Sequence, residues 1–222
     1  MPELQCTAYG PDALLLTFAA RADDAAFRRA RALVRALAQN PPPGLREVVP
    51  AYTTLLLLFD PGRRAELPAL GHDLARRLGG VDAIDLPPPT RHVIPVIYDG
   101  PDLARLAAGH GLTPAEVIAR HTAPVYRVHL LGFAPGFAYL GGLDPVLHTP
   151  RLPTPRPRVP AGSVGIGGEQ TGIYPLATPG GWNLIGRTHT TLFDPSRGAA
   201  GHAETMFLLQ PGDEVRFTEV PA

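Results

Sequence analysis

The chain has 222 residues, its 20 lysines and arginines equal its 20 aspartates and glutamates in number, and Cys6 is its only cysteine. The balanced charge excludes an overall positive field for nucleic acid or an anionic membrane, and a single cysteine excludes an internal disulfide. The longest apolar run, 55–59, is too short to cross a bilayer, and the N-terminal segment does not resemble a signal peptide. We therefore expect a cytoplasmic protein that binds neither nucleic acid nor membranes.

The first 86 residues predict a small α+β domain. Apolar residues recur at helical spacing in two segments, and the segments around them have the short apolar patterns of strands. The expected elements are two strands within 4–20, a helix over 24–38, a strand over 48–59, a helix over 67–78 and a strand over 81–86. Pro50 predicts a bulge or a sheet edge in the third strand. This ββαβαβ order favours a ferredoxin-like domain over 1–86, ending at the proline run 87–89.

Residues 87–222 predict a second, mainly β domain. Its first expected elements are a strand over 92–98 and two helices, over 102–108 and 114–121. Thr113 and Glu116 have the spacing of a capping box at the start of the second helix. Beyond residue 125, short apolar segments alternate with Gly and Pro turns, a pattern typical of a barrel or sandwich.

The segment 132–186 contains 12 of the 24 glycines and only five charged residues. Its glycines alternate with Phe, Tyr, Trp, Leu and Ile, whereas disordered linkers are usually polar. Glycine permits sharp turns and close approach of the backbone to other groups. The segment therefore predicts short barrel strands and loops that line a ligand site.

Two other motifs resemble functional signatures but fit packing better. The helix pair over 102–118 resembles a helix-turn-helix, yet its second helix offers Ala115, Glu116 and Arg120 rather than a set of base-reading side chains. Ser163, followed by Asp194 and His202, resembles a hydrolase order, but prolines precede it and no helix-forming run follows. The chain also has no phosphate-binding loop and no paired histidine spacing, so we expect no metal site and no ATP binding by this chain alone.

Four long motifs carry a family resemblance. They are Gly-Phe-Ala-Pro-Gly-Phe-Ala-Tyr-Leu-Gly-Gly at 132–142, Pro-Arg at 155–156 with Val-Pro-Ala-Gly-Ser-Val-Gly-Ile-Gly-Gly at 159–168, Gln-Thr-Gly-Ile-Tyr-Pro at 170–175, and Thr-Pro-Gly-Gly-Trp at 178–182 with Ile-Gly-Arg-Thr at 185–188. In this order they resemble the family of 5-oxoprolinase B subunits, also called allophanate hydrolase subunit 1, which includes a sporulation histidine-kinase inhibitor. Ala138 departs from the family, whose loop often has proline there.

The resemblance implies an N-terminal α+β domain followed by a cyclophilin-like β-barrel. It also implies a stable complex with the C subunit of 5-oxoprolinase. Together with the A subunit, this complex would carry out an ATP-dependent opening of the lactam of 5-oxoproline to L-glutamate, and the chain is then expected to be inactive alone. Two other functions remain open: a non-catalytic module that inhibits a sensor histidine kinase, and a urea- or allophanate-processing subunit.

A polar pocket at one barrel end is the predicted site. His129, Arg156 and Arg187 are its predicted catalytic residues, because a substrate carboxylate needs a fixed cation and a proton must move near neutral pH. Backbone amides of four glycines are predicted to bind the substrate, namely Gly136, Gly165, Gly167 and Gly168. For each side chain taken alone, a structural role, as a surface arginine or a hydrogen-bonded strand histidine, is slightly favoured. The apolar run 133–143 is predicted to lie at the partner interface or beside the site.

Overall fold

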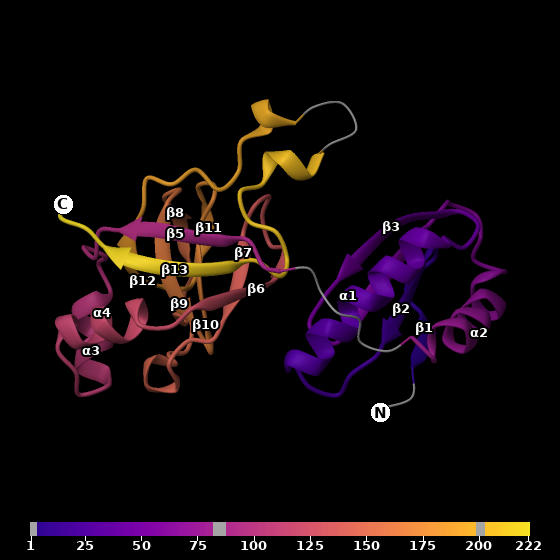
Figure 1. Cartoon of the computed structure of the whole chain (residues 1–222), viewed down its shortest axis with the longest axis horizontal. Helices are drawn as coiled ribbons and strands as arrows, with labels where there is room; N and C mark the ends of the chain where they lie inside the picture. The colour runs from indigo at the N-terminus through magenta and orange to yellow at the C-terminus, as the bar shows by residue number, and fades with distance from the viewer. Residues whose placement is uncertain (1–3, 82–87, 199–202) are drawn as a thin grey trace. The chain divides into compact units, whose positions relative to one another are not determined.

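The computed structural model describes residues 4–81, 88–198 and 203–222. The chain divides into two compact units, Met1–Pro88 and Pro89–Ala222, shown in Figure 1. The boundary predicted between 86 and 87 stays a prediction, because 82–87 lie outside the described residues. No helix in the described part of the chain is both long enough and apolar enough to cross a membrane.

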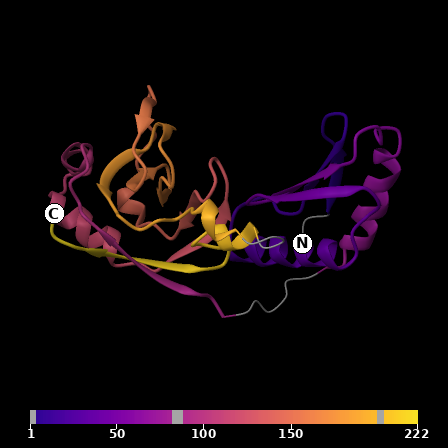
Figure 2. The same ribbon diagram turned by 90° about the horizontal axis from the view of Figure 1, so that it is seen from above.

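The N-terminal unit packs two helices on one face of a four-stranded antiparallel sheet (Figures 1 and 2). The strands, in sheet order, are β1 (Gln5–Ala8), β2 (Ala13–Thr17), β4 (Thr54–Phe59) and β3 (Leu45–Pro50). The helices are α1 (Asp24–Gln39) and α2 (Leu67–Leu78). Alternate residues of β4 are fully buried, and they join the inward faces of both helices in one apolar core.

The single strand predicted over 48–59 is wrong, because this segment belongs to a hairpin. The chain reverses after Pro50, where the Ala51 amide donates to the Thr54 carbonyl oxygen at 2.8 Å, and β3 pairs with β4. Pro50 does lie on an edge strand, where its missing N–H costs no ladder hydrogen bond. The described order is therefore ββαββα. A ferredoxin-like domain is not confirmed. The edge strand that pairs with β2 is the N-terminal β1, and most of the strand predicted over 81–86 lies outside the described residues.

The C-terminal unit is built on a nearly closed seven-stranded barrel. In sheet order the strands are β12 (Asn183–Arg187), β9 (Ser163–Gly167), β10 (Gln170–Ile173), β7 (Ala138–Gly141), β6 (Tyr126–Leu131), β13 (Glu214–Glu219) and β5 (Arg91–Val96). Directly after β5, Ile97 bridges to Arg187 at the end of β12 through two hydrogen bonds of 2.8 Å. This bridge joins the two outer strands of the sheet, so the barrel expected for this part of the chain is present.

Two short helices and a small strand pair complete this unit (Figure 1). The helices are α3 (Leu103–Gly109) and α4 (Pro114–Thr122), and the pair consists of β8 (Arg156–Val159) and β11 (Thr178–Gly180). The predicted capping box at Thr113 and Glu116 is confirmed, and its hydrogen bonds hold the pKa of Glu116 below its usual value. Apolar residues of both helices belong to the barrel core, so the helix pair has a packing role.

A histidine is fully buried where α4 meets the barrel. His121 Nδ1 lies 2.6 Å from the Tyr98 hydroxyl, and its Nε2 lies 2.8 Å from the Thr171 hydroxyl. Its ring stacks on Phe217 at 4.6 Å between centroids. Burial disfavours the charged imidazolium and lowers the pKa of His121 to about 3. The histidine is therefore a neutral part of the core.

Candidate functional site

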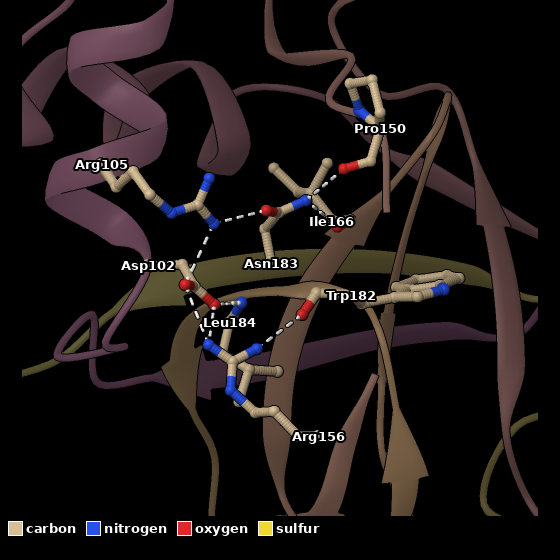
Figure 3. A network of polar contacts seen from close by, with 8 residues as sticks. All are labelled: Asp102, Arg105, Pro150, Arg156, Ile166, Trp182, Asn183 and Leu184. Atoms are coloured by element: carbon tan, nitrogen blue, oxygen red, sulfur yellow. Dashed lines mark hydrogen bonds and ion pairs between the residues drawn. The ribbon is translucent and has the colours of Figure 1, made fainter. Parts of the chain in front are cut away.

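A buried carboxylate, that of Asp102, organises the polar side chains at the start of α3 (Figure 3). One guanidinium nitrogen of Arg156 lies 2.9 and 2.8 Å from its two oxygens, and Arg105 donates to one of them at 3.0 Å. The Leu184 backbone amide donates to the other at 2.7 Å. Four hydrogen bonds therefore compensate the burial of one charge, as a carboxylate in a low-dielectric interior requires.

The same network fixes the backbone at the start of β12. Arg156 also donates to the Trp182 carbonyl oxygen at 3.2 Å, and Arg105 donates to the Asn183 side-chain oxygen at 2.7 Å. The Asn183 amide in turn donates to the carbonyl oxygens of Pro150 and Ile166, each at 3.0 Å. Figure 3 shows the Trp182 ring on the side of the strand away from Asp102. The network thus positions this tryptophan.

The Trp182 ring forms part of an aromatic cleft of about 330 Å³. Aromatic rings and glycines make up most of its lining, together with Arg151, Leu152 and two prolines. Phe137, Tyr174 and Trp182 are almost completely buried and meet edge to face, with centroids 5.3 to 6.5 Å apart. The volume lies at the lower end of the range for small-molecule sites. We call this cavity the aromatic cleft.

The rim of the aromatic cleft carries one cation and one strained aromatic residue. The Arg151 guanidinium lies 5.9 Å from the centre of the Trp182 ring, a cation–π distance. Phe133 has a φ of 70° and is 61% exposed as a residue, although its ring contacts Phe137 at 5.3 Å between centroids. A positive φ is unfavourable for a bulky residue, and strain of this kind is concentrated at functional sites.

The structure gives the three predicted catalytic side chains different partners. Arg156 is held by Asp102, and Arg187 forms a surface ion pair with Asp99 at 2.9 Å. His129 lies at a register shift in β6, with its ring directly over Gly141 of β7. Among the described contacts none joins these three side chains to one another. Their catalytic role stays a prediction, and the observed contacts of Arg156 give it a positioning role.

The four predicted substrate-binding glycines lie in two separate places. Gly165 and Gly167 are on β9 beneath the Trp182 side chain, where a Cβ on Gly167 would lie 2.6 Å from the indole. Gly168 follows in the β9–β10 turn with a φ of 66°. Gly136 has a φ of 79° and packs against Phe193. Gly165 and Gly167 therefore make room for the tryptophan, and substrate binding by these amides stays a prediction.

Ser163 and Asp194, the two described members of the serine motif, do not have the arrangement of a hydrolase site. Ser163 is buried and begins β9, an extended strand, rather than standing on an exposed strand-to-helix turn. Asp194 instead caps a short 3₁₀ helix through Ser196, and His202 lies outside the described residues.

Sequence reasoning missed two residues of this region. Asp102 stands at a helix start, where its usual role is to cap the helix, but its carboxylate makes no cap hydrogen bond. Arg151 follows Pro150 in a polar, proline-rich loop, and its position over Trp182 has no local signal. The tryptophan itself, preceded by two glycines in an uncharged segment, was the available signal for the aromatic cleft.

Comparisons with known proteins agree with this architecture. The carboxyltransferase domain, subdomain C and D, family model matches residues 4–202. The chain is 42% identical over 221 residues to the B subunit of 5-oxoprolinase from Escherichia coli O157:H7, covering 98% of this chain and 96% of that protein. It is 38% identical over 224 residues to the B subunit of 5-oxoprolinase from Bacillus subtilis (strain 168), covering 95% and 90%.

Solved structures show the same fold within longer chains. The chain superposes on TTHA0988 with a TM-score of 0.77 and 45% identity, covering 95% of this chain but only 40% of that one. It also superposes on Kluyveromyces lactis urea carboxylase with a TM-score of 0.76 at 19% identity, covering 98% and 22%, which shows a shared fold alone. With the sequence similarities, these findings establish that the chain belongs to the family of 5-oxoprolinase B subunits, whose fold is that of carboxyltransferase subdomains C and D.

Proposed function

We propose that this chain is the B subunit of an ATP-dependent 5-oxoprolinase, which together with the A and C subunits opens the lactam of 5-oxoproline to L-glutamate. The observation that carries the proposal is the similarity to two proteins named as the B subunit of 5-oxoprolinase, along 90% or more of their lengths. Because this similarity spans both units of the chain, it favours the same role as in those proteins. Similarity limited to one domain would be weaker support, since proteins of different function can share a single domain.

The chemistry explains why such a reaction needs ATP. The ring amide is stabilised by resonance between its nitrogen and carbonyl, so water attacks it slowly. Transfer of the γ-phosphoryl group to the amide oxygen would activate the carbonyl carbon. Water then adds, the C–N bond breaks, and phosphate leaves; the products are glutamate, ADP and phosphate. We assign ATP to the complex rather than to this chain alone, because the sequence has no phosphate-binding loop and because Arg151 is the one cation among the described residues that lines the aromatic cleft.

Partner proteins are part of the same proposal. TTHA0988 carries this fold within a chain of which the present protein covers 40%, so in that protein the fold is joined to a further large segment. We propose that here the corresponding partner is the C subunit, bound as a stable heteromer, and that the A subunit completes the enzyme. Within the run 133–143, Phe133 is the exposed large apolar residue, and Phe137, Leu140 and Leu143 are buried in the C-terminal unit. Phe133 is therefore the contact that this run offers a partner.

Omission of this chain tests the proposed function. We expect a mixture of the A, B and C subunits to hydrolyse ATP in a 5-oxoproline-dependent way and to release glutamate. Leaving out this chain should lower that rate about 100-fold or more, since a missing part of a preorganised site typically costs 10²–10³ in rate. Adding the purified chain back should restore it. Full turnover by the A and C subunits alone would contradict the proposal, and would favour a binding module without a catalytic role.

A further inference from the structure

We propose that the aromatic cleft binds the cyclic amide substrate itself, with the ring against the aromatic walls and the carboxylate paired with Arg151. This inference rests on the proposed function for the identity of the ligand. Its physical basis is the aromatic cleft, which combines buried aromatic walls with a single cation at the rim.

The walls suit a small, flat ring. Phe137 and Tyr174 stand nearly perpendicular, at 79°, and Trp182 is nearly perpendicular to both. The flat faces of such rings are apolar surfaces on which a five-membered ring can pack. The Asp102 network holds Trp182 from behind, so this wall is preorganised and little side-chain entropy is lost on binding.

Arg151 lines the aromatic cleft and is available to pair with an anionic ligand. Its side chain is exposed, and it forms no ion pair with any residue of 4–81, 88–198 and 203–222. Arg156, in contrast, is already bound by Asp102. A guanidinium can bind a carboxylate through two parallel hydrogen bonds, and the neighbouring indole face limits the hydration that such a pair must displace.

The single positive charge and the small volume of the aromatic cleft limit the class of ligand that it can bind. One positive charge matches one carboxylate, whereas a nucleoside triphosphate carries several negative charges and needs a phosphate cradle. Tyr139 lines the same cleft, and its hydroxyl has no hydrogen-bond partner among the described side chains, so it is available to the polar atoms of the ring amide. The ligand class is therefore a small cyclic amide with one acidic group.

The fluorescence of Trp182 tests binding directly, because it is the only tryptophan of the chain. We expect 5-oxoproline to change its emission saturably in the full-length protein, with a Kd in the millimolar range or below. Replacing the guanidinium in Arg151→Gln should weaken binding about tenfold or more, the effect of losing a charge-assisted hydrogen bond. Arg158→Gln is the matched control, an exposed arginine in β8 that does not line the cleft, and its Kd should equal that of the wild type.

Ligand analogues separate the two parts of the proposal. 2-Pyrrolidinone keeps the ring amide but lacks the carboxylate, so it should bind at least about tenfold more weakly, and Arg151→Gln should not weaken it further. L-Proline keeps the carboxylate but replaces the amide by an ammonium group, so equal binding of proline would show that the amide is not recognised and overturn the stated ligand class.

The outcome is distinguishable from a failure of the proposed function. If the three-subunit enzyme turns over normally while 5-oxoproline leaves the fluorescence unchanged, or while Arg151→Gln keeps the wild-type Kd and KM, the inference is overturned and the function stands. If 5-oxoproline binds in a way that depends on Arg151 but the three-subunit mixture has no 5-oxoprolinase activity, the proposed function is overturned. The inference that the aromatic cleft binds the ligand then still stands. Arg151→Lys provides a second variant if Arg151→Gln does not fold, and it should give an intermediate Kd.

Discussion

Replacing Asp102 by asparagine should lower the free energy of unfolding of the C-terminal unit by about 3 kcal/mol. Asp102 is 5% exposed, and its carboxylate is shared by two guanidinium groups and one backbone amide. Asparagine keeps the shape but removes the charge and turns an NH₂ group toward donors. Removing one partner of a buried ion pair typically costs about 3–5 kcal/mol. Arg105 and Arg156 are partly exposed and can regain water, which places the expected loss at the lower end.

Denaturant unfolding followed by the emission of Trp182 measures this effect within the correct unit, since the only tryptophan lies there. Asp99→Asn is the matched control. It removes the same charge from the ion pair with Arg187, whose two side chains are 45% and 44% exposed, and should cost less than about 1 kcal/mol. Equal losses in the two variants would show that the Asp102 network does not stabilise the barrel.

The stability of the C-terminal unit should fall by about 2 kcal/mol between pH 6.5 and pH 5 because of His121. Its pKa is depressed in the folded state to about 3, whereas the ordinary value is 6.5. In this window the unfolded chain binds a proton that the folded chain does not, so unfolding is favoured as the pH falls, by about 1.4 kcal/mol per pH unit. The contribution of the neutral, buried His121 to the free energy of unfolding is fully present above pH 6.5 and is lost progressively below it.

Unfolding curves at several pH values, again read from Trp182, check this slope. His121→Gln should be less stable at pH 7.5, because its side chain cannot satisfy both Tyr98 and Thr171, but its stability should depend less on pH. His189→Gln alters an exposed histidine and should keep the wild-type slope. Parallel curves for wild type and His121→Gln would show that another group causes the acid sensitivity. Staying above pH 5 avoids the carboxyls of Asp144 and Asp194, whose pKa values are lowered by hydrogen bonds.

Much of the fold could be predicted because its helices and several of its strands follow from patterns within short stretches of sequence. The helices over 24–38, 67–78 and 114–121 follow from apolar spacing, caps and breakers, and the structure shifts their ends by a residue at most. The hairpin of β3 and β4 was missed for a local reason as well. Strand-like residues continue on both sides of the turn at 51–53, and without Gly the turn has no strong signal.

The site was predicted less well than the fold, because its contacts join distant parts of the chain. The sequence by itself determined that glycines and aromatic residues concentrate in 132–186, and that Arg156 stands among prolines that restrict its backbone. Only the tertiary structure decided that Arg156 pairs with Asp102, 54 positions earlier, and that Arg151 lies over Trp182. Periodicity and turn chemistry act over a few residues, whereas ion pairs and ring contacts depend on distances set only when the barrel closes.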